Sequence, residues 1–247
     1  AVGALSAPGV GCRAFRSPAA VPLPPPHCRA PARDAAAPPG TYPDVGPDVV
    51  KALGDRTPVV TVSAEGRKPL NILALSGGGQ YGTYAAGLLV GWTDRGDRPA
   101  FDVCTGISSG ALTAAFAFLG PKYDPNLRRL AVGLTGDDVF RFQPVRQLAR
   151  HSAVACSEPL RRVIAAEFDD GFVADLKAAH AAGRRLFVGT MNLQTRRLVV
   201  WDLTALAGSA DPRAGDRVRQ VLLASSSIAG FVPAVDIPVT VDGVTHV

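Results

Sequence analysis

The chain has 247 residues, of which 47% are hydrophobic and 19% charged, so it can bury the core of one large domain. Its formal charge of +5 comes from dispersed arginines, and only 6% of its residues are aromatic, which argues against a nucleic-acid groove. The four cysteines lie far apart without a CxxC pair. We therefore expect no metal site and no dense disulfide framework.

Residues 1–69 are predicted to form a leader and a Pro/Ala-rich tail. The stretch Gly9-Val10-Gly11-Cys12 resembles the box before the lipidated cysteine of bacterial lipoproteins, although Gly9 stands where leucine is usual. An ordinary Ala/Gly/Pro leader is the alternative. The prolines that follow favour an extended spacer, with one short edge strand at Val59–Val62. From this pattern we expect a protein of the cell envelope, anchored through a lipid on Cys12.

A domain is predicted from residue 70 to residue 247, because short apolar runs alternate there with amphipathic segments. The expected strands are Asn71–Leu75, Phe101–Thr105, Arg185–Met191 and Arg197–Leu203. The expected helices are Tyr84–Trp92, Ala111–Leu119, Glu158–Phe168, Val173–Ala182 and Val218–Ser226. This alternation indicates an α/β sandwich around a mainly parallel sheet.

The sequence Gly106-Ile107-Ser108-Ser109-Gly110 matches the G-x-S-x-G pattern of a nucleophile elbow. In an elbow, a serine occupies a strained turn from a strand to a helix, and glycines flank it because side chains there would collide with backbone. The pattern alone is weak, but here it follows an apolar strand and precedes an apolar helix. We therefore predict Ser108 as a nucleophile, with Gly106 and Gly110 shaping its turn.

A glycine run, Gly77-Gly78-Gly79, follows the first strand and admits three interpretations. With Gly82 it satisfies the G-x-G-x-x-G dinucleotide fingerprint, but that site also needs an acidic residue at the end of the next strand, which here runs into Thr105-Gly106-Ile107-Ser108. It can form a nest of N–H groups for the oxyanion of an acyl intermediate, with Gly78 at positive φ. It can also be a purely structural turn.

The two motifs, about 30 residues apart, together resemble the patatin-like phospholipase family. Ala224–Val235 looks like that family's segment before its catalytic aspartate, and Gly189–Leu193 is similar to its central strand. The likeness covers roughly residues 70–247 and implies a three-layer sandwich. It also implies a Ser–Asp dyad that needs neither metal nor organic cofactor. One departure is Tyr81, which stands where the family usually has Arg or Lys.

The base is harder to assign. The Asp-Gly pair after the Ala224 segment is Asp242-Gly243, which separates two β-prone runs and so predicts a hairpin turn. In the resembling family, the catalytic Asp-Gly follows such a hairpin. We therefore expect the aspartate just beyond Val247, in a domain incomplete at its C-terminus, with Asp242 as the alternative. His246 keeps a Ser–His mechanism open; His27, His151 and His180 lack a motif.

The sequence thus predicts a serine lipid acyl hydrolase, a phospholipase or esterase, that forms an acyl-enzyme at Ser108. Gly77, Gly78 and Gly79 would stabilise its oxyanion, and no cofactor is expected. Its expected partners are a lipid or phospholipid and a membrane surface, and nucleic acid is not expected. The alternatives are a Ser–His esterase or acyltransferase, a catalytically inactive lipid-binding module, and a nucleotide-binding protein.

Overall fold

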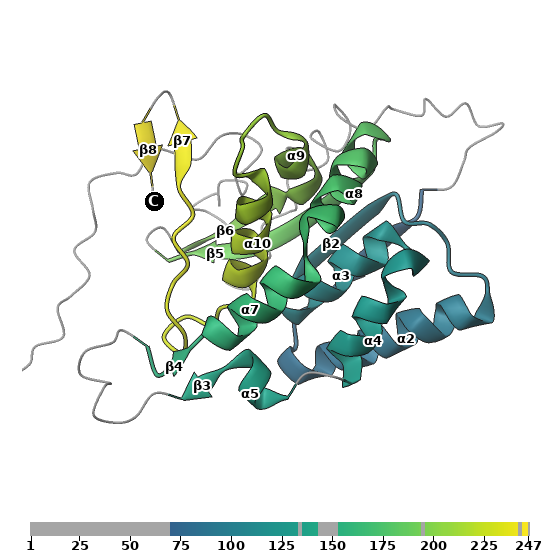
Figure 1. Ribbon diagram of the computed structural model, residues 1–247, viewed down its shortest axis with the longest axis horizontal. Coiled ribbons are helices and arrows are strands. Elements are labelled where there is room, and N and C mark those ends of the chain that lie inside the picture. The colour runs from purple at the N-terminus through teal and green to yellow at the C-terminus, as the bar shows by residue number, and fades with distance from the viewer. Residues whose placement is uncertain (1–69, 133–134, 143–152, 194–195, 242–243, 247) are drawn as a thin grey trace, which may run out of the picture.

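The computed structural model describes residues 70–132, 135–142, 153–193, 196–241 and 244–246 (Figure 1). The predicted leader and tail, including Val59–Val62 and Cys12, lie outside these residues, as do His27, His151 and Asp242. Within the described part, every predicted strand and helix is present, with ends shifted by a few residues.

A four-stranded sheet forms the centre of the fold in the order β1-β2-β5-β6. β1, β2 and β5 run parallel, while β6 returns antiparallel to β5. The mainly parallel sheet follows from the apolar runs, since side chains on such strands need cover from crossover helices. The strands are β1 (Ile72–Leu75), β2 (Val103–Ile107), β5 (Arg185–Asn192) and β6 (Arg197–Asp202).

Helices and short elements connect and flank the strands. The helices are α2 (Gly82–Arg95), α3 (Ser109–Leu119), α4 (Asp124–Val132), α5 (Gly136–Val139), α7 (Glu158–Glu167), α8 (Asp170–Ala181), α9 (Leu203–Gly208) and α10 (Ala214–Ser225), with 3₁₀ turns η2 (Gly79–Tyr81) and η3 (Pro121–Tyr123). Two small antiparallel ladders pair β3 (Arg141–Phe142) with β4 (Ala155–Cys156), and β7 (Val239–Val241) with β8 (Val244–His246). The second ladder is the hairpin predicted around Asp242-Gly243.

The described helices lie over one face of the sheet (Figure 1). The parallel strands follow one another in a single direction across the sheet, and right-handed crossovers then place their helices on the same side. The other face presents Ile72, Ile107, Met191 and Leu198, each at least 41% exposed. The predicted α/β sandwich with a mainly parallel sheet is confirmed. The helices in the described residues cover the face opposite Ile72, Ile107, Met191 and Leu198.

α3 is the central helix, and every residue from Gly110 to Phe118 is buried. Aromatic rings surround its second half: Phe116 stacks on Phe168 with centroids 4.4 Å apart, and Phe168 meets Phe172 edge-on at 4.9 Å. Such ring pairs add about 0.5–1.5 kcal/mol each beyond the area they bury. The helix that starts at Ser109 is therefore anchored along its length by the core.

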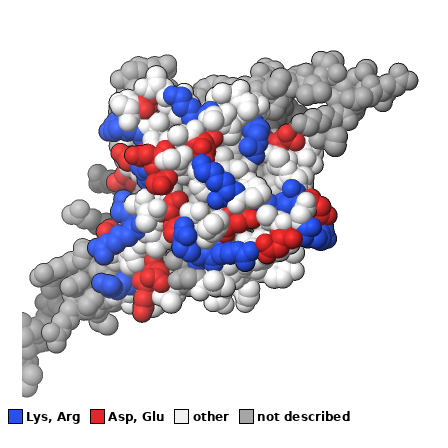
Figure 2. Space-filling view, turned by 45° about the vertical axis from the view of Figure 1, so that its right-hand side comes forward, with Lys and Arg blue, Asp and Glu red and all other residues white. Residues whose placement is uncertain are grey.

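The charged surface consists of both signs in close alternation on the face shown in Figure 2. α4 contributes two ion pairs, Arg128 with Asp94 at 2.9 Å and Arg129 with Glu167 at 2.8 Å. Such exposed pairs contribute little to stability.

Among the described residues, none of the helices combines the length and the apolar character that a membrane span requires.

Candidate active site

Ser108 occupies the turn between the end of β2 and the start of α3. Its backbone has φ 54° and ψ −131°, a region that non-glycine residues rarely adopt and that costs about 1–3 kcal/mol. Such strain persists only where the surrounding structure enforces it. Here it gives the strand-to-helix geometry that the G-x-S-x-G pattern predicts.

The flanking glycines are required because the turn is packed against backbone. A Cβ on Gly106 would lie 2.5 Å from the carbonyl oxygen of Gly110 and 2.7 Å from Cα of Ala111. A Cβ on Gly110 would lie 2.7 Å from the carbonyl oxygen of Leu75 and closer still to that of Ser76. Neither site can hold a side chain without moving main chain, so the start of α3 packs directly on the end of β1.

The glycine run lies against the elbow. A Cβ on Gly77 would come within 3.1 Å of Cβ of Ser108, and one on Gly82 within 2.7 Å of Cβ of Ser109. Two motifs far apart in the sequence thus meet at the carboxyl ends of β1 and β2. The expected positive φ is found at Gly79 (55°) rather than at Gly78, whose φ of 171° is extended backbone. The prediction for Gly78 was wrong because the turn reverses one residue later.

The turn leaves two backbone donors unpaired. The Tyr81 N–H donates to the Gly78 carbonyl at 3.1 Å, and the Gly82 N–H returns to the carbonyls of Gln80 and Gly79. The N–H groups of Gly78 and Gly79 donate to no acceptor within the described part of the chain. Successive free N–H groups of this kind attract an anion.

Ser225, near the end of α10, ties the elbow to the sheet. Its hydroxyl accepts a hydrogen bond from the Ser108 N–H at 2.9 Å and donates one to the Gly189 carbonyl on β5 at 2.7 Å. The backbone N–H of Ser108 is therefore already occupied. An anion bound beside Ser108 must take its hydrogen bonds from other N–H groups.

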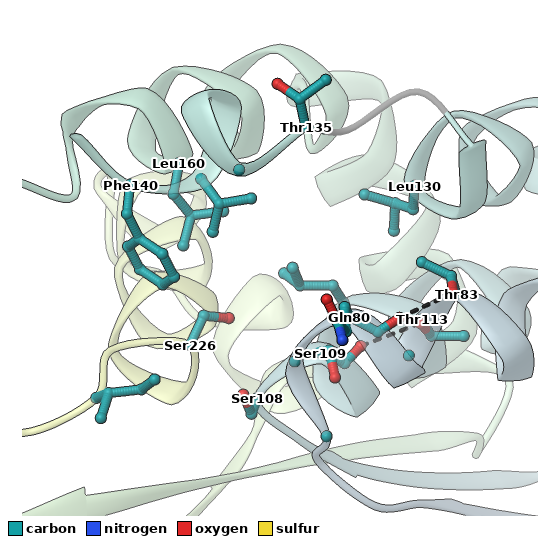
Figure 3. Close-up of a pocket in the computed structure, with 17 residues that line it drawn as sticks. Gln80, Thr83, Ser108, Ser109, Thr113, Leu130, Thr135, Phe140, Leu160 and Ser226 are labelled. Atoms are coloured by element: carbon teal, nitrogen blue, oxygen red, sulfur yellow. Dashed lines mark hydrogen bonds between the residues drawn. The ribbon is translucent and has the colours of Figure 1, made fainter. Parts of the chain in front are cut away.

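A pocket of about 600 Å³ opens over Ser108 (Figure 3). Gln80, Thr83 and Leu130 of α4 lie on one side of it, Phe140, Leu160 of α7 and Ser226 lie across from them, and Thr135 lies between the two sides (Figure 3). Six of its side chains are apolar, six carry hydroxyls, and Gln80 carries an amide. The lining residues are Gly78, Gly79, Gln80, Gly82, Thr83, Ser108, Ser109, Leu112, Thr113, Leu130, Thr135, Gly136, Val139, Phe140, Leu160, Ser226 and Ile228.

None of these lining residues is charged or a histidine. His180 lies elsewhere, with Nδ1 3.3 Å from the Thr204 hydroxyl between α8 and α9. Asp242 falls outside the described residues, and only the backbone of His246 is described. In the described ranges, no three His, Cys, Asp or Glu side chains gather as a metal site would need.

The neighbouring thiol is not an alternative nucleophile. Cys104 on β2 is fully buried on the core face of the sheet, and this burial raises the pKa of its thiol to about 12. The thiolate form, which is the reactive one, is thereby suppressed. Tyr81, the departure from the resembling family, is 76% exposed and does not line the pocket.

The comparison with protein families agrees with this geometry. The model of the family described as patatin-like phospholipase matches residues 73–246, a span that begins in β1 and includes both motifs. The chain belongs to the patatin-like phospholipase family. This patatin-like protein is therefore a member of a lipid acyl hydrolase family whose substrates are lipid esters. No curated protein matches it.

The structure of this patatin-like protein also reveals features that sequence reasoning missed. The bridge made by Ser225 and the position of Ser226 in the pocket lining were not apparent from a run of three serines, and α4 and α5 were not predicted. The capping box of Thr135 and Asp138 was a local signal for α5. The contact of α5 with the site depends on long-range packing, for which the sequence carries no comparable signal.

Proposed function

We propose that this protein is a serine lipid acyl hydrolase in which Ser108 attacks the carbonyl carbon of a lipid ester. The observation that carries the proposal is the strained Ser108 turn with Gly77 packed against it. Gly78 and Gly79, whose N–H groups are free, line the same pocket as Ser108, and we propose that these N–H groups stabilise the oxyanion. Gly77 allows the glycine run to lie close to Ser108 because it has no side chain, and a Cβ there would come within 3.1 Å of Cβ of Ser108. The 3₁₀ turn η2 then begins at Gly79.

The proposed reaction proceeds through an acyl-enzyme. A carboxylate base takes the proton of the Ser108 hydroxyl while the oxygen bonds to the acyl carbon, and the carbonyl electrons become the oxyanion. Collapse of the tetrahedral intermediate breaks the bond to the alcohol, which leaves with the proton from the base. Water then repeats the sequence and releases the fatty acid.

We propose an aspartate as this base, supplied after the β7–β8 hairpin as in the resembling family. Val241 pairs with Val244, which supports the hairpin on which that assignment rests. Asp242 is the alternative. The test compares this chain with one extended by its native downstream residues, each with and without Asp242→Asn. Full activity of the unextended chain, silenced by Asp242→Asn, would assign the base to Asp242.

Labelling by a fluorophosphonate probe tests the nucleophile directly. The probe should label the wild-type protein and fail to label Ser108→Ala, while Ser209→Ala, which removes an exposed hydroxyl away from the pocket, should label normally. Hydrolysis of a nitrophenyl ester should follow the same pattern. Labelling of Ser108→Ala at the wild-type rate would refute Ser108. A wild-type protein that binds lipid but never labels would be an inactive lipid-binding module.

We also propose that the pocket opens toward a membrane surface. Ile228 lines the pocket and is 57% exposed, and Phe142 is 71% exposed. Phe231 joins Phe142 to the lining residue Phe140 through ring contacts of 5.7 and 5.1 Å. Apolar side chains at the mouth of an apolar pocket favour an interface. Phe142→Glu, outside the pocket lining, should weaken vesicle binding and leave hydrolysis of a soluble ester intact; unchanged vesicle binding would refute the proposed membrane surface.

The proposed position in the cell envelope rests on Cys12. Metabolic labelling with a palmitate analogue should mark the full-length precursor and fail on Cys12→Ser. Cys28→Ser is the matched control, because it removes another thiol from the same segment of residues 1–69. Labelling that survives Cys12→Ser would remove the lipid anchor from the proposal.

A further inference from the structure

Three consecutive serines lie at the C-terminal end of α10, with Ser225 as its last residue and Ser226 as its C-cap, and their hydroxyls have three different environments. The Ser225 hydroxyl bridges Ser108 and Gly189, as described above. The Ser227 hydroxyl donates to the Leu223 carbonyl within the helix at 2.8 Å. The Ser226 hydroxyl is buried and has no hydrogen-bond partner in the described structure, in a residue only 8% exposed.

The missing partner of Ser226 is unusual, because most buried hydroxyls are hydrogen-bonded and an unbonded one destabilises the fold. The backbone N–H of Ser226 is paired, since it donates to the carbonyls of Leu222 and Leu223. The side-chain hydroxyl is not paired. Ser226 lines the pocket, and Figure 3 shows its hydroxyl directed into the open space from the α10 side.

The other hydroxyls around the pocket are mostly committed. Thr83 donates to the Gln80 carbonyl at 2.8 Å, and Thr113 to the Ser109 carbonyl at 3.0 Å. The Ser109 hydroxyl is also unpaired, but it lies beside Gly82, on the side of the glycine run. Ser226 is therefore the unpaired hydroxyl available on the opposite, α10 side of Ser108.

The chemistry of an ester indicates which atom Ser226 would meet. Besides the serine oxygen, the tetrahedral carbon carries the oxyanion, the acyl chain and the alcohol oxygen. The glycine run takes the oxyanion, and an acyl chain fits the apolar lining of Leu112, Leu130, Val139 and Leu160. The alcohol oxygen is the remaining polar atom, and it needs a polar partner in this apolar surrounding.

We infer that Ser226 is a substrate-binding residue whose hydroxyl donates a hydrogen bond to the alcohol oxygen of the scissile ester. The inference rests on the proposed function, because it assumes attack by Ser108. Ser226 keeps its own proton throughout and positions the leaving group. It makes the site selective for oxygen esters over thioesters, since sulfur is a weak hydrogen-bond acceptor.

The test compares an alkyl oxoester with the thioester of the same acyl and alkyl groups in the full-length protein. In Ser226→Ala, kcat/KM for the oxoester should fall roughly 5- to 50-fold, the range expected for one lost hydrogen bond to a partly charged oxygen. The thioester should fall no further than it does in Ser227→Ala, the matched control. The melting temperature of Ser226→Ala should equal or exceed that of the wild type, because an unpaired buried hydroxyl is removed.

An equal loss on both esters, no loss on the oxoester, or a lower melting temperature for Ser226→Ala would each overturn the inference. Fluorophosphonate labelling separates this failure from that of the proposed function, since the probe's leaving group is fluoride and carries no alcohol oxygen. If the wild type and Ser226→Ala label alike without selective oxoester loss, only the role of Ser226 is refuted. If the wild type does not label, both proposals fail.

Discussion

Replacing Ser225 with alanine removes the one oxygen that joins the Ser108 N–H to the Gly189 carbonyl. Ser225 is only 9% exposed, so water does not readily replace that oxygen. A buried donor or acceptor left unpaired costs about 1–3 kcal/mol, and two such groups at the lower end of that range amount to about 2–4 kcal/mol. In a domain of this size, each kcal/mol lowers the melting temperature by about 2–4 °C, so we expect a fall of roughly 5–15 °C.

Ser227→Ala is the matched control, because it removes a hydroxyl two residues away on the same helix end. Its partner, the Leu223 carbonyl, still accepts the Ser226 N–H at 3.1 Å, so the loss should stay below about 1 kcal/mol. The two variants are compared by thermal melting and by steady-state hydrolysis of one soluble ester. Because Ser225 positions Ser108 without contacting substrate, its loss should lower kcat and leave KM nearly unchanged. Equal melting temperatures, or a change confined to KM, would refute this account.

Four further predictions concern the elbow and the core. Ser108→Gly should be about 1–2 kcal/mol more stable than Ser108→Ala in chemical denaturation, because only glycine relaxes the positive φ; equal stabilities would contradict the strain. Gly110→Ala should lose at least about 2 kcal/mol through its backbone clash, whereas Gly87→Ala, with open space around its Cβ, should gain up to about 1 kcal/mol. Cys104, whose pKa burial raises to about 12, should resist alkylation until the protein unfolds, as site-resolved mass spectrometry would show; labelling in the native state would contradict this. Hydrogen bonds from Lys122 and then Tyr123 lower the pKa of Asp175, so this carboxylate stabilises the fold at neutral pH. The stability gap between wild type and Asp175→Asn should therefore close as the pH falls below about 4, and a gap that persists there would refute the ion pair.

The elbow could be predicted from sequence because its determinants are local. An apolar strand, two glycines around a serine and an apolar helix occupy only 19 consecutive residues, Phe101–Leu119, and each of these features restricts the backbone of its neighbours. The glycine run was equally visible, although its positive φ was assigned to Gly78 instead of Gly79. A one-residue error of this kind is expected, because in a run of glycines no side chain marks which one reverses the chain.

The walls of the pocket could not be predicted in the same way. α4 is a polar nine-residue segment, and one of its anchors is the buried ion pair of Asp124 with Arg98 at 2.9 Å. α5 has only four residues. Helices this short are unstable alone and exist because of tertiary packing. The bridge made by Ser225 likewise depends on how α10 packs on β5 and β2, which a run of three serines in the sequence does not indicate.

The two sides of the pocket differ in how many substitutions they can accept without loss of the fold. Ser108 and the glycine run are built into the ends of the central strands, where a single added methyl at Gly106 or Gly110 meets main chain. The facing side is carried by α5 and its surroundings, outside the sheet, where Val139 and Phe140 are only half-buried. If the proposed function holds, substitutions there can lengthen, shorten or bend the space for an acyl chain at little risk to folding. Variation in chain-length preference among descendants or engineered forms of this protein should therefore be concentrated at Leu130 and in residues 135–140, while Ser108 and the glycine run stay constant.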